Sequence, residues 1–364
     1  MDGNGFTTQL LAWYDAGKRD LPWRRDPDPY AVWVSEIMAQ QTQIDRVVEY
    51  HNRWMARFPD IRSLAEAGEE DVLNLWEGLG YYTRARNLHR AAALVMGEFG
   101  GEFPADYADI RALPGVGDYT AGAVASIAFG LPEPAVDANV LRVFARLLDV
   151  AAPVRSKAGR AVIEQAVREL IPEGRPGDFN QAVMELGALV CRKNPDCAGC
   201  PVRDHCAALA RGTVAERPVL PAPKEVIRID MATGVLLHEG RVLIQKRKPD
   251  DVWPGLWEFP GGCIEQGETP ELALAREYME EVELRVRPVE KITVVRYSYT
   301  RYRVTMHCFL CAFDGDPATP VFNEAVEGGF VPPARLDGYA FPSGHRRLAE
   351  TMRADVRFAH LFDS

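Results

Sequence analysis

Four cysteines lie close together in this 364-residue chain, at Cys191, Cys197, Cys200 and Cys206. Their spacing, Cys-x5-Cys-x2-Cys-x5-Cys, would allow four thiolates to surround one metal centre. The other three cysteines are scattered, and a tight cluster of four in a chain expected in the cytoplasm indicates metal binding rather than disulfides. The sequence therefore predicts a metal site, with zinc and iron–sulfur both compatible with the spacing.

Two carboxylates stand where they could act on a glycosidic bond. Glu36 lies in a strongly apolar stretch, residues 30–42, and an apolar setting raises the pKa of a carboxyl so that it can serve as a general acid. Asp137 precedes an apolar periodic run, where it could act as a helix cap or as an ionised catalytic carboxylate. An acid beside a carboxylate is the arrangement that glycosidases use, but spacing alone does not show whether Glu36 and Asp137 meet.

A glycine-containing turn lies between two predicted helices, in LPGVGDYTAG at 113–122. Gly115 and Gly117 permit a tight turn, and the second helix then begins with free backbone N–H groups that favour a phosphate. A simple corner between helices has nearly the same pattern. On its own, this motif favours DNA binding only slightly.

The elements that must position these residues change in character near residue 211. Up to that point apolar residues recur at helical spacing, as in Leu10, Leu11 and Tyr14. Three prolines then occur within residues 218–223, which is typical of an extended linker. Beyond them the pattern alternates: a hairpin is expected at Glu239-Gly240, two strands within 292–313, and a helix over 270–284. We therefore expect an all-α domain at 1–211 with a metal module at about 187–211, a linker at 212–226, and an α+β domain at 227–364.

Composition and charge exclude several classes of protein. Hydrophobic residues make up 47% and charged residues 26%, as in ordinary folded domains rather than disordered, collagen-like or coiled-coil chains. The net charge is −10, with −6 in residues 1–211 and −4 in the rest, so nucleic-acid binding would depend on a local basic patch. No apolar run is long enough to span a membrane, and no signal sequence is visible. We expect a cytoplasmic, nucleoid-associated monomer.

Further motifs follow in a fixed order: LPWR at 21–24, WVSEIM at 33–38, QQTQ at 40–43, WEGLGYY at 76–82, RARNLH at 84–89 and NQAVMELGA at 180–188. With the turn, the Asp137 segment and the cysteines, they give a chain that resembles the MutY family of adenine DNA glycosylases over essentially its full length. The resemblance implies a helix–hairpin–helix domain with one 4Fe–4S cluster, followed by a Nudix-like domain. It also implies a monofunctional enzyme that hydrolyses the N-glycosidic bond of adenine opposite 8-oxoguanine or guanine in double-stranded DNA.

The resemblance also implies a role for each matched residue. Glu36 would protonate adenine N7, and Asp137 would stabilise or capture the sugar cation. Tyr119 and Asn139 would hold Asp137 and the attacking water, and Tyr81 would wedge into the base stack beside 8-oxoguanine. The remaining assignments are Arg24 and Gln41 for the adenine pocket; Gly115, Gly117, Arg192 and Lys193 for DNA; Tyr299, Thr300 and Arg301 for 8-oxoguanine; and Cys191, Cys197, Cys200 and Cys206 for the cluster.

The C-terminal domain carries a second motif, which closely resembles the Nudix signature: Gly262, Glu268, Arg276, Glu277, Glu280 and Glu281 at the expected spacing. At helical spacing Glu277, Glu280 and Glu281 share a face, as magnesium binding would require. Glu283, however, stands where the signature has glycine, which would permit a sharp turn, and it adds negative charge. We therefore expect this domain to recognise 8-oxoguanine within DNA and not to hydrolyse free nucleotides.

The chain departs from the family pattern at three further places. Ala39 replaces a leucine, the first cysteine interval is one residue shorter, and Arg301 replaces a histidine. Three other functions are compatible with parts of the sequence. A bifunctional glycosylase and lyase of the endonuclease III type needs a lysine where this chain has Tyr119. A Nudix nucleotide hydrolase would use the helical half only for docking, and a DNA-binding module without activity would need neither Glu36 nor Asp137.

Overall fold

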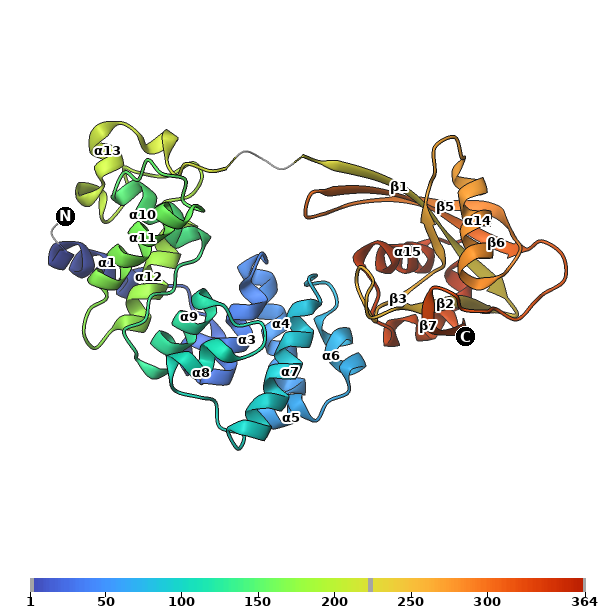
Figure 1. The fold of residues 1–364 in the computed structure, drawn as a ribbon, viewed down its shortest axis with the longest axis horizontal. Helices are drawn as coiled ribbons and strands as arrows, with labels where there is room; N and C mark the ends of the chain where they lie inside the picture. The colour runs from blue at the N-terminus through green and yellow to red at the C-terminus, as the bar shows by residue number, and fades with distance from the viewer. Residues whose placement is uncertain (1–2, 222–224, 363–364) are drawn as a thin grey trace. The chain divides into compact units, whose positions relative to one another are not determined.

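The computed structural model describes residues 3–221 and 225–362, and the chain divides into two compact units. One unit consists of Met1–Ala67 and Thr83–Ala222, and the other of Gly68–Tyr82 and Pro223–Ser364. The first is helical and the second is built on a β-sheet (Figure 1). The expected fold class, an all-α domain followed by an α+β domain, is confirmed. Part of the expected linker, residues 222–224, lies outside the described residues.

The helical unit contains α1 (Gly3–Gly17), α2 (Pro22–Arg25), α3 (Pro29–Ala39), α4 (Ile44–Arg57), α5 (Ile61–Ala65), α7 (Thr83–Glu98), α8 (Tyr107–Ala112), α9 (Asp118–Phe129), α10 (Ala138–Leu147), α11 (Lys157–Leu170), α12 (Pro176–Leu189) and α13 (Ala207–Arg211). One core joins α1, α10 and α12 through Leu10, Phe144 and Phe179, which are all fully buried. Leu10, Leu11 and Tyr14 share the buried face of α1, as the helical spacing predicts. Among the described residues, no helix is both long and apolar enough to cross a bilayer.

The helix α3 is buried on every side. All residues from Tyr30 to Met38 are buried, including Glu36, and α3 packs against both α4 and α9. The apolar stretch around Glu36 therefore lies inside the protein rather than at its surface. A carboxyl on such a helix loses most of its hydration.

The predicted turn connects α8 to α9. Gly115 has φ +78°, and an added Cβ there would lie 2.6 Å from the side chain of Asn87. This close approach makes glycine necessary on both conformational and steric grounds. Gly117 is the N-cap residue of α9, which leaves the first N–H groups of this helix without an intrahelical partner.

The second unit is built on seven strands: β1 (Ile227–His238), β2 (Arg241–Arg247), β3 (Trp257–Glu258), β4 (Gly261–Cys263), β5 (Val286–Tyr299), β6 (Tyr302–Phe313) and β7 (Ala325–Val331). The strand order is β3-β2-β1-β6-β5, with β4 paired to β1 and β7 to β2. Strands β1 and β6 run parallel, and the other pairs are antiparallel. The hairpin expected at Glu239-Gly240 is confirmed, because Leu237 pairs with Val242. The two strands expected within 292–313 are β5 and β6, of which β5 begins earlier, at Val286.

Two helices cover opposite faces of this sheet. Val235 and Ile244 lie in the core that contains residues of α15 (Ser343–Ala354), whereas Leu236 and Leu243 lie in the core that contains residues of α14 (Pro270–Val282). Successive strand residues point to opposite faces, so both faces require apolar cover (Figure 1). The remaining helix of this unit is α6 (Glu69–Trp76).

The turn after α14 corrects one step of the sequence argument. Glu283 was expected to hinder a sharp turn, because the Nudix signature has glycine there. In the structure Glu283 adopts the left-handed conformation itself, with φ +54° and ψ +29°, and ends the helix as its C-cap residue. Asn323 donates a hydrogen bond to its carboxylate (3.2 Å). The turn is therefore made despite the missing glycine.

Candidate active site

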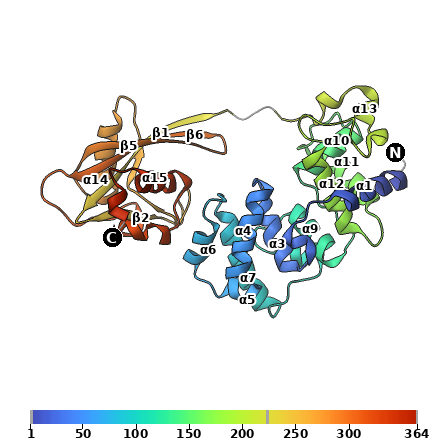
Figure 2. The ribbon, with the colours of Figure 1, turned by 180° about the vertical axis from the view of Figure 1, so that it is seen from behind.

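Glu36 and Asp137 line one pocket of about 500 Å³ in the helical unit. Glu36 comes from α3 and Asp137 from the start of α10, and Tyr119 in the first turn of α9 and Asn139 line the same pocket. The helices α3, α9 and α12 can be followed from behind in Figure 2. The tertiary structure thus brings together two carboxylates separated by 101 positions in the sequence.

The carboxyl of Glu36 is held in an apolar environment. Its side chain is 8% exposed, and the hydroxyl of Tyr119 donates a hydrogen bond to Oε2. Burial raises the pKa of Glu36 to about 7; the Tyr119 hydrogen bond opposes this rise and the charge of Asp137 adds to it. A substantial fraction of Glu36 is therefore protonated near neutral pH, as a general acid must be.

Asp137 is a helix cap and a member of the pocket at the same time. Its Oδ1 accepts a hydrogen bond from the backbone N–H of Val140 (2.7 Å), and its Oδ2 accepts one from Nδ2 of Asn139 (2.8 Å). Burial raises the pKa of Asp137, while these hydrogen bonds oppose the rise. Asn139 is fixed in turn by Arg142, whose guanidinium donates to Asn139 Oδ1 (2.7 Å) and to the Cys191 carbonyl (2.8 Å).

Tyr119 lies in the expected pocket near Asp137, and its hydroxyl is hydrogen-bonded to Glu36. The family resemblance implies that it holds Asp137 and the water; in the structure its hydroxyl donates to Glu36 and lies 3.5 Å from the sulfur of Met184. The reason is that α9 packs directly on α3, which carries Glu36. Tyr119 therefore contacts the proposed acid directly, and Asn139 donates the side-chain hydrogen bond to Asp137.

A buried ion-pair network forms another wall of the pocket. Arg24 donates to Gln181 Oε1 (2.8 Å) and to Glu185 Oε2 (3.0 Å), and Arg19 binds both oxygens of Glu185 at 2.8 Å. Glu185 is 1% exposed; burial alone would raise its pKa, but Arg19 and Arg24 lower it to about 2. Arg24 was expected here. Arg19, Gln181 and Glu185 were not singled out, although Gln181 and Glu185 belong to the recognised motif at 180–188.

Gln41 departs from its expected position. It was assigned to the adenine pocket, but in the structure its side chain is exposed and its neighbours Ala39 and Thr42 line the pocket instead. The chain leaves α3 after Ala39, and Gln41 then adopts φ +59°, a left-handed conformation. This local turn changes the direction of the chain at the residue that the motif pointed to.

The four clustered cysteines line a single cavity of the helical unit, together with apolar side chains of α10 and α12. All four are free thiols and partly buried. Burial, together with the neighbouring thiols, raises the pKa of Cys200 to about 11. No three His, Cys, Asp or Glu side chains within residues 3–221 and 225–362 form a recognised single-ion site. Four thiols that line one cavity nevertheless fit a thiolate-bound metal centre.

A buried cation lies beside these thiols. Arg146 is 4% exposed, and its guanidinium contacts Cys191 Sγ (3.3 Å) and the carbonyls of Arg192 (2.7 Å) and Lys193 (3.2 Å). The site therefore offers positive charge to an anionic group held by thiolates. Arg192 and Lys193 themselves have exposed side chains.

The residues expected to contact the lesion base lie in the second unit. The ring centroids of Tyr81 and Tyr299 are 5.6 Å apart, and Tyr299 also contacts Trp253 (5.4 Å). Tyr81 and Thr300 both have φ +51°, and Thr300 and Arg301 are exposed between β5 and β6. The structure thus places Tyr81 next to the segment that begins at Tyr299.

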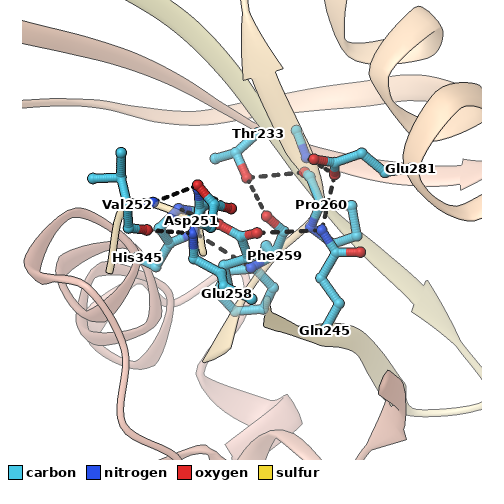
Figure 3. Close-up of polar contacts among 11 residues, drawn as sticks. Thr233, Gln245, Asp251, Val252, Glu258, Phe259, Pro260, Glu281 and His345 are labelled. Carbon is cyan, nitrogen blue, oxygen red and sulfur yellow. Dashed lines mark hydrogen bonds and ion pairs between the residues drawn. The ribbon is translucent and has the colours of Figure 1, made fainter. Parts of the chain in front are cut away.

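The acidic residues of α14 have dissimilar surroundings. Glu281 is held against the sheet, where Gln245 Nε2 and the Gly261 N–H each donate to its Oε2 at 2.9 Å (Figure 3). Burial, and then the charge of Glu258, raises the pKa of Glu281 to about 8. Glu277 and Glu280 are instead paired with Arg276, at 2.9 and 3.0 Å. A shared helical face therefore does not give these carboxylates a shared environment.

Comparison with known proteins agrees with the two-part architecture. Residues 34–172 match the family model "HhH-GPD superfamily base excision DNA repair protein", and residues 232–351 match "NUDIX domain". The adenine DNA glycosylase of Mus musculus is 41% identical over 71% of this chain, which spans only about half (52%) of that relative. The adenine DNA glycosylase of Rattus norvegicus is 34% identical over 86% of this chain and 72% of its own length. A solved structure of a thermostable thymine-DNA glycosylase is 26% identical, with a TM-score of 0.54, and covers 57% of this chain and 97% of its own.

Proposed function

Because the chain belongs to the adenine DNA glycosylase family, we propose that it excises adenine opposite 8-oxoguanine or guanine in duplex DNA. The observation that carries this proposal is that Glu36 and Asp137 line one pocket. The bond broken is the N-glycosidic bond, and water is the second substrate. The enzyme is monofunctional, since Tyr119 stands where a lyase would need an amine.

Glu36 is the general acid. With a pKa of about 7 it holds a proton near neutral pH, and Tyr119 engages its Oε2. The proton is delivered to N7 of the flipped adenine, which turns the base into a neutral leaving group. Tyr119 keeps the carboxyl in place during this transfer.

Asp137 stabilises the positive charge that develops on the sugar as the bond breaks, either as an ion pair or by covalent capture. Two hydrogen bonds, from Val140 and Asn139, orient its oxygens before substrate arrives. Such preorganisation favours the transition state over the bound substrate. Water then attacks the sugar.

The base is received by the wall that Arg24 and Gln181 form. Arg24 is held by its ion pair with Glu185, and Gln181 is held by its hydrogen bond with Arg24. Both side chains are therefore in place at the pocket before a base enters it. A base inside a duplex cannot reach this wall, so the nucleotide must be flipped out.

Several other groups contact the DNA. The N–H groups at the start of α9, after Gly115 and Gly117, bind phosphate. Tyr81 wedges into the gap in the base stack, and Tyr299, Thr300 and Arg301 contact 8-oxoguanine. We assign residues 1–211 to the glycosylase domain, 212–226 to a linker and 227–364 to the recognition domain.

Cys191, Cys197, Cys200 and Cys206 hold one 4Fe–4S cluster. The shared cavity and the adjacent Arg146 support this assignment. When bound, the cluster supplies a rigid anionic centre. The segment between Cys191 and Cys197 then presents Arg192 and Lys193 to phosphate. A colourless protein with stoichiometric zinc would contradict the assignment.

The test is single-turnover cleavage of duplexes that carry adenine opposite 8-oxoguanine, guanine, thymine or cytosine. We expect excision from the first two, fastest opposite 8-oxoguanine, and an intact abasic strand until alkali is added. Strand nicking without alkali would indicate lyase chemistry. Absence of any adenine release would contradict the proposed function.

A further inference from the structure

The segment Gly68–Tyr82 belongs to the unit that contains the sheet, although in the sequence it lies between α5 and α7 of the helical unit. Its main attachment is an ion pair between Glu77 and Arg346 of α15. Arg346 Nε donates to Glu77 Oε1 (2.7 Å), and its Nη2 donates to Glu77 Oε2 (2.8 Å). Two parallel bonds of this kind fix orientation as well as distance.

Besides the pair of Glu70 with Lys246 (2.6 Å), three more hydrogen bonds hold the same segment. The backbone N–H of Phe341 donates to Glu77 Oε1 (3.1 Å), and the hydroxyl of Tyr82 donates to the Phe341 carbonyl (2.9 Å). Asn74 Nδ2 donates to the Gly338 carbonyl (2.8 Å). These attachments lie on both sides of Tyr81 in the sequence, four residues before it at Glu77 and one residue after it at Tyr82.

The Glu77–Arg346 pair is largely removed from water. The two side chains are 16% and 15% exposed, respectively. Arg346 also donates to the carbonyls of Tyr339 (2.6 Å) and Leu336 (3.2 Å), so its guanidinium is fixed from the other side. Losing Arg346 would leave the Glu77 carboxylate buried without this cation, whereas losing Glu77 would leave Arg346 its contact with the exposed Asp337 (3.2 Å). Breaking a buried pair costs more than breaking an exposed one.

This attachment determines what lies beside Tyr81. Tyr81 has φ +51° and faces Tyr299, with ring centroids 5.6 Å apart, and Thr300 follows directly in the chain. A non-glycine residue in the left-handed region keeps that conformation only when its surroundings hold it there. The bonds at Glu77 and Tyr82 restrain the chain on both sides of Tyr81.

We propose that Glu77 and Arg346 are positioning residues that hold Tyr81 in register with Tyr299 and Thr300, and thereby set the preference for 8-oxoguanine over guanine. The inference rests on the proposed function. Tyr81 in the base stack and Thr300 on 8-oxoguanine discriminate best when the distance between them is fixed before DNA binds. In that case binding does not have to order these side chains. The ion pair fixes that separation without touching DNA.

The experiment compares Glu77→Gln, Arg346→Met and Arg346→Lys with the full-length parent. Single-turnover excision is measured on duplexes with adenine opposite 8-oxoguanine and opposite guanine. A 2-aminopurine placed next to 8-oxoguanine reports wedging of Tyr81 through its fluorescence. Arg353→Gln is the matched control, because Arg353 lies on the same helix and pairs with Asp337, the exposed carboxylate that Arg346 also contacts (2.9 and 3.2 Å, respectively). This control separates the Asp337 contact from the Glu77 contact.

We expect Glu77→Gln and Arg346→Met to lower the ratio of the excision rate opposite 8-oxoguanine to the rate opposite guanine by about tenfold. The rate on the guanine duplex should stay within about twofold, the 2-aminopurine signal should fall, and Arg346→Lys should retain more of the preference than Arg346→Met. Arg353→Gln should match the parent.

Two results would overturn the inference. One is an unchanged rate ratio and fluorescence signal in Glu77→Gln. The other is an equal fall on both duplexes with a lowered Tm, which would show a structural role only. In both cases the parent still excises adenine. Failure of the proposed function is a separate result, since the parent itself would then release no adenine from either duplex.

Discussion

The hydroxyl of Tyr119 donates its hydrogen bond to Glu36, and Asn139 holds Asp137. Each of the two carboxylates therefore has its own polar side-chain partner. Glu36 sits in the more apolar surroundings and Asp137 accepts the larger number of hydrogen bonds. This division fits one protonated and one ionised carboxyl in a single pocket.

Removing either carboxyl should abolish excision. For Glu36→Gln and for Asp137→Asn we expect a fall of at least about 10²-fold in the single-turnover rate, because the lost group acts in the transition state. Binding to the mismatch should survive, since neither group is needed for docking. Rates and gel-shift affinities on the same duplex check this, and near-parent rates in either variant would show that its residue is misassigned.

The rate should fall as pH rises through about 7, the value to which burial raises the pKa of Glu36. The acid must be protonated to act, so the active form is lost on the alkaline side. A single-turnover rate profile from pH 5.5 to 9 measures the midpoint. A rate that kept rising above pH 8 would rule out Glu36 as the acid.

The same shift predicts how stability depends on pH. The folded pKa of Glu36 lies above its unfolded value, so the folded state holds more protons between these values and loses stability as pH rises through them. Glu36→Gln has no such loss. We therefore expect the Tm of Glu36→Gln minus the Tm of the parent to increase by about 2 °C or more between pH 4.5 and pH 7. A constant difference across this range would contradict the assignment.

Glu185→Gln should destabilise the helical unit strongly. It leaves Arg19 and Arg24 without their carboxylate inside the protein, which typically costs about 3–5 kcal/mol. Glu164→Gln is the control, because its pair with Arg160 is exposed and should cost at most about 1 kcal/mol. Urea unfolding of both variants gives the comparison, and equal losses would show that burial of the Glu185 network is unimportant.

Tyr119→Lys should create strand-nicking activity. The Tyr119 side chain lines the pocket beside Glu36, so an amine in its place could attack the sugar and form a Schiff base. Borohydride trapping of a protein–DNA adduct detects this intermediate, with Tyr119→Phe as the control that cannot form one. Failure to trap any adduct would mean that position 119 does not reach the sugar.

Much of this protein follows from its sequence. Periodicity of apolar residues separates the helical part from the sheet, because spacing along one segment is a local property. The hairpin at Glu239-Gly240 and the helix at 270–284 follow in the same way. The ordered motifs predict catalytic roles for Glu36 and Asp137 and a metal site at the four cysteines.

Which of these groups meet depends on tertiary packing. Packing of α9 on α3 brings the Tyr119 hydroxyl to Glu36, and Gln41 is exposed in the turn after α3. The ion pairs of Glu185 and of Glu77 join residues more than 160 positions apart in the sequence. Such contacts depend on how whole elements pack, and residue spacing does not encode them. Even the turn at Glu283 was decided by its surroundings, because tertiary contacts hold a conformation that the residue type disfavours.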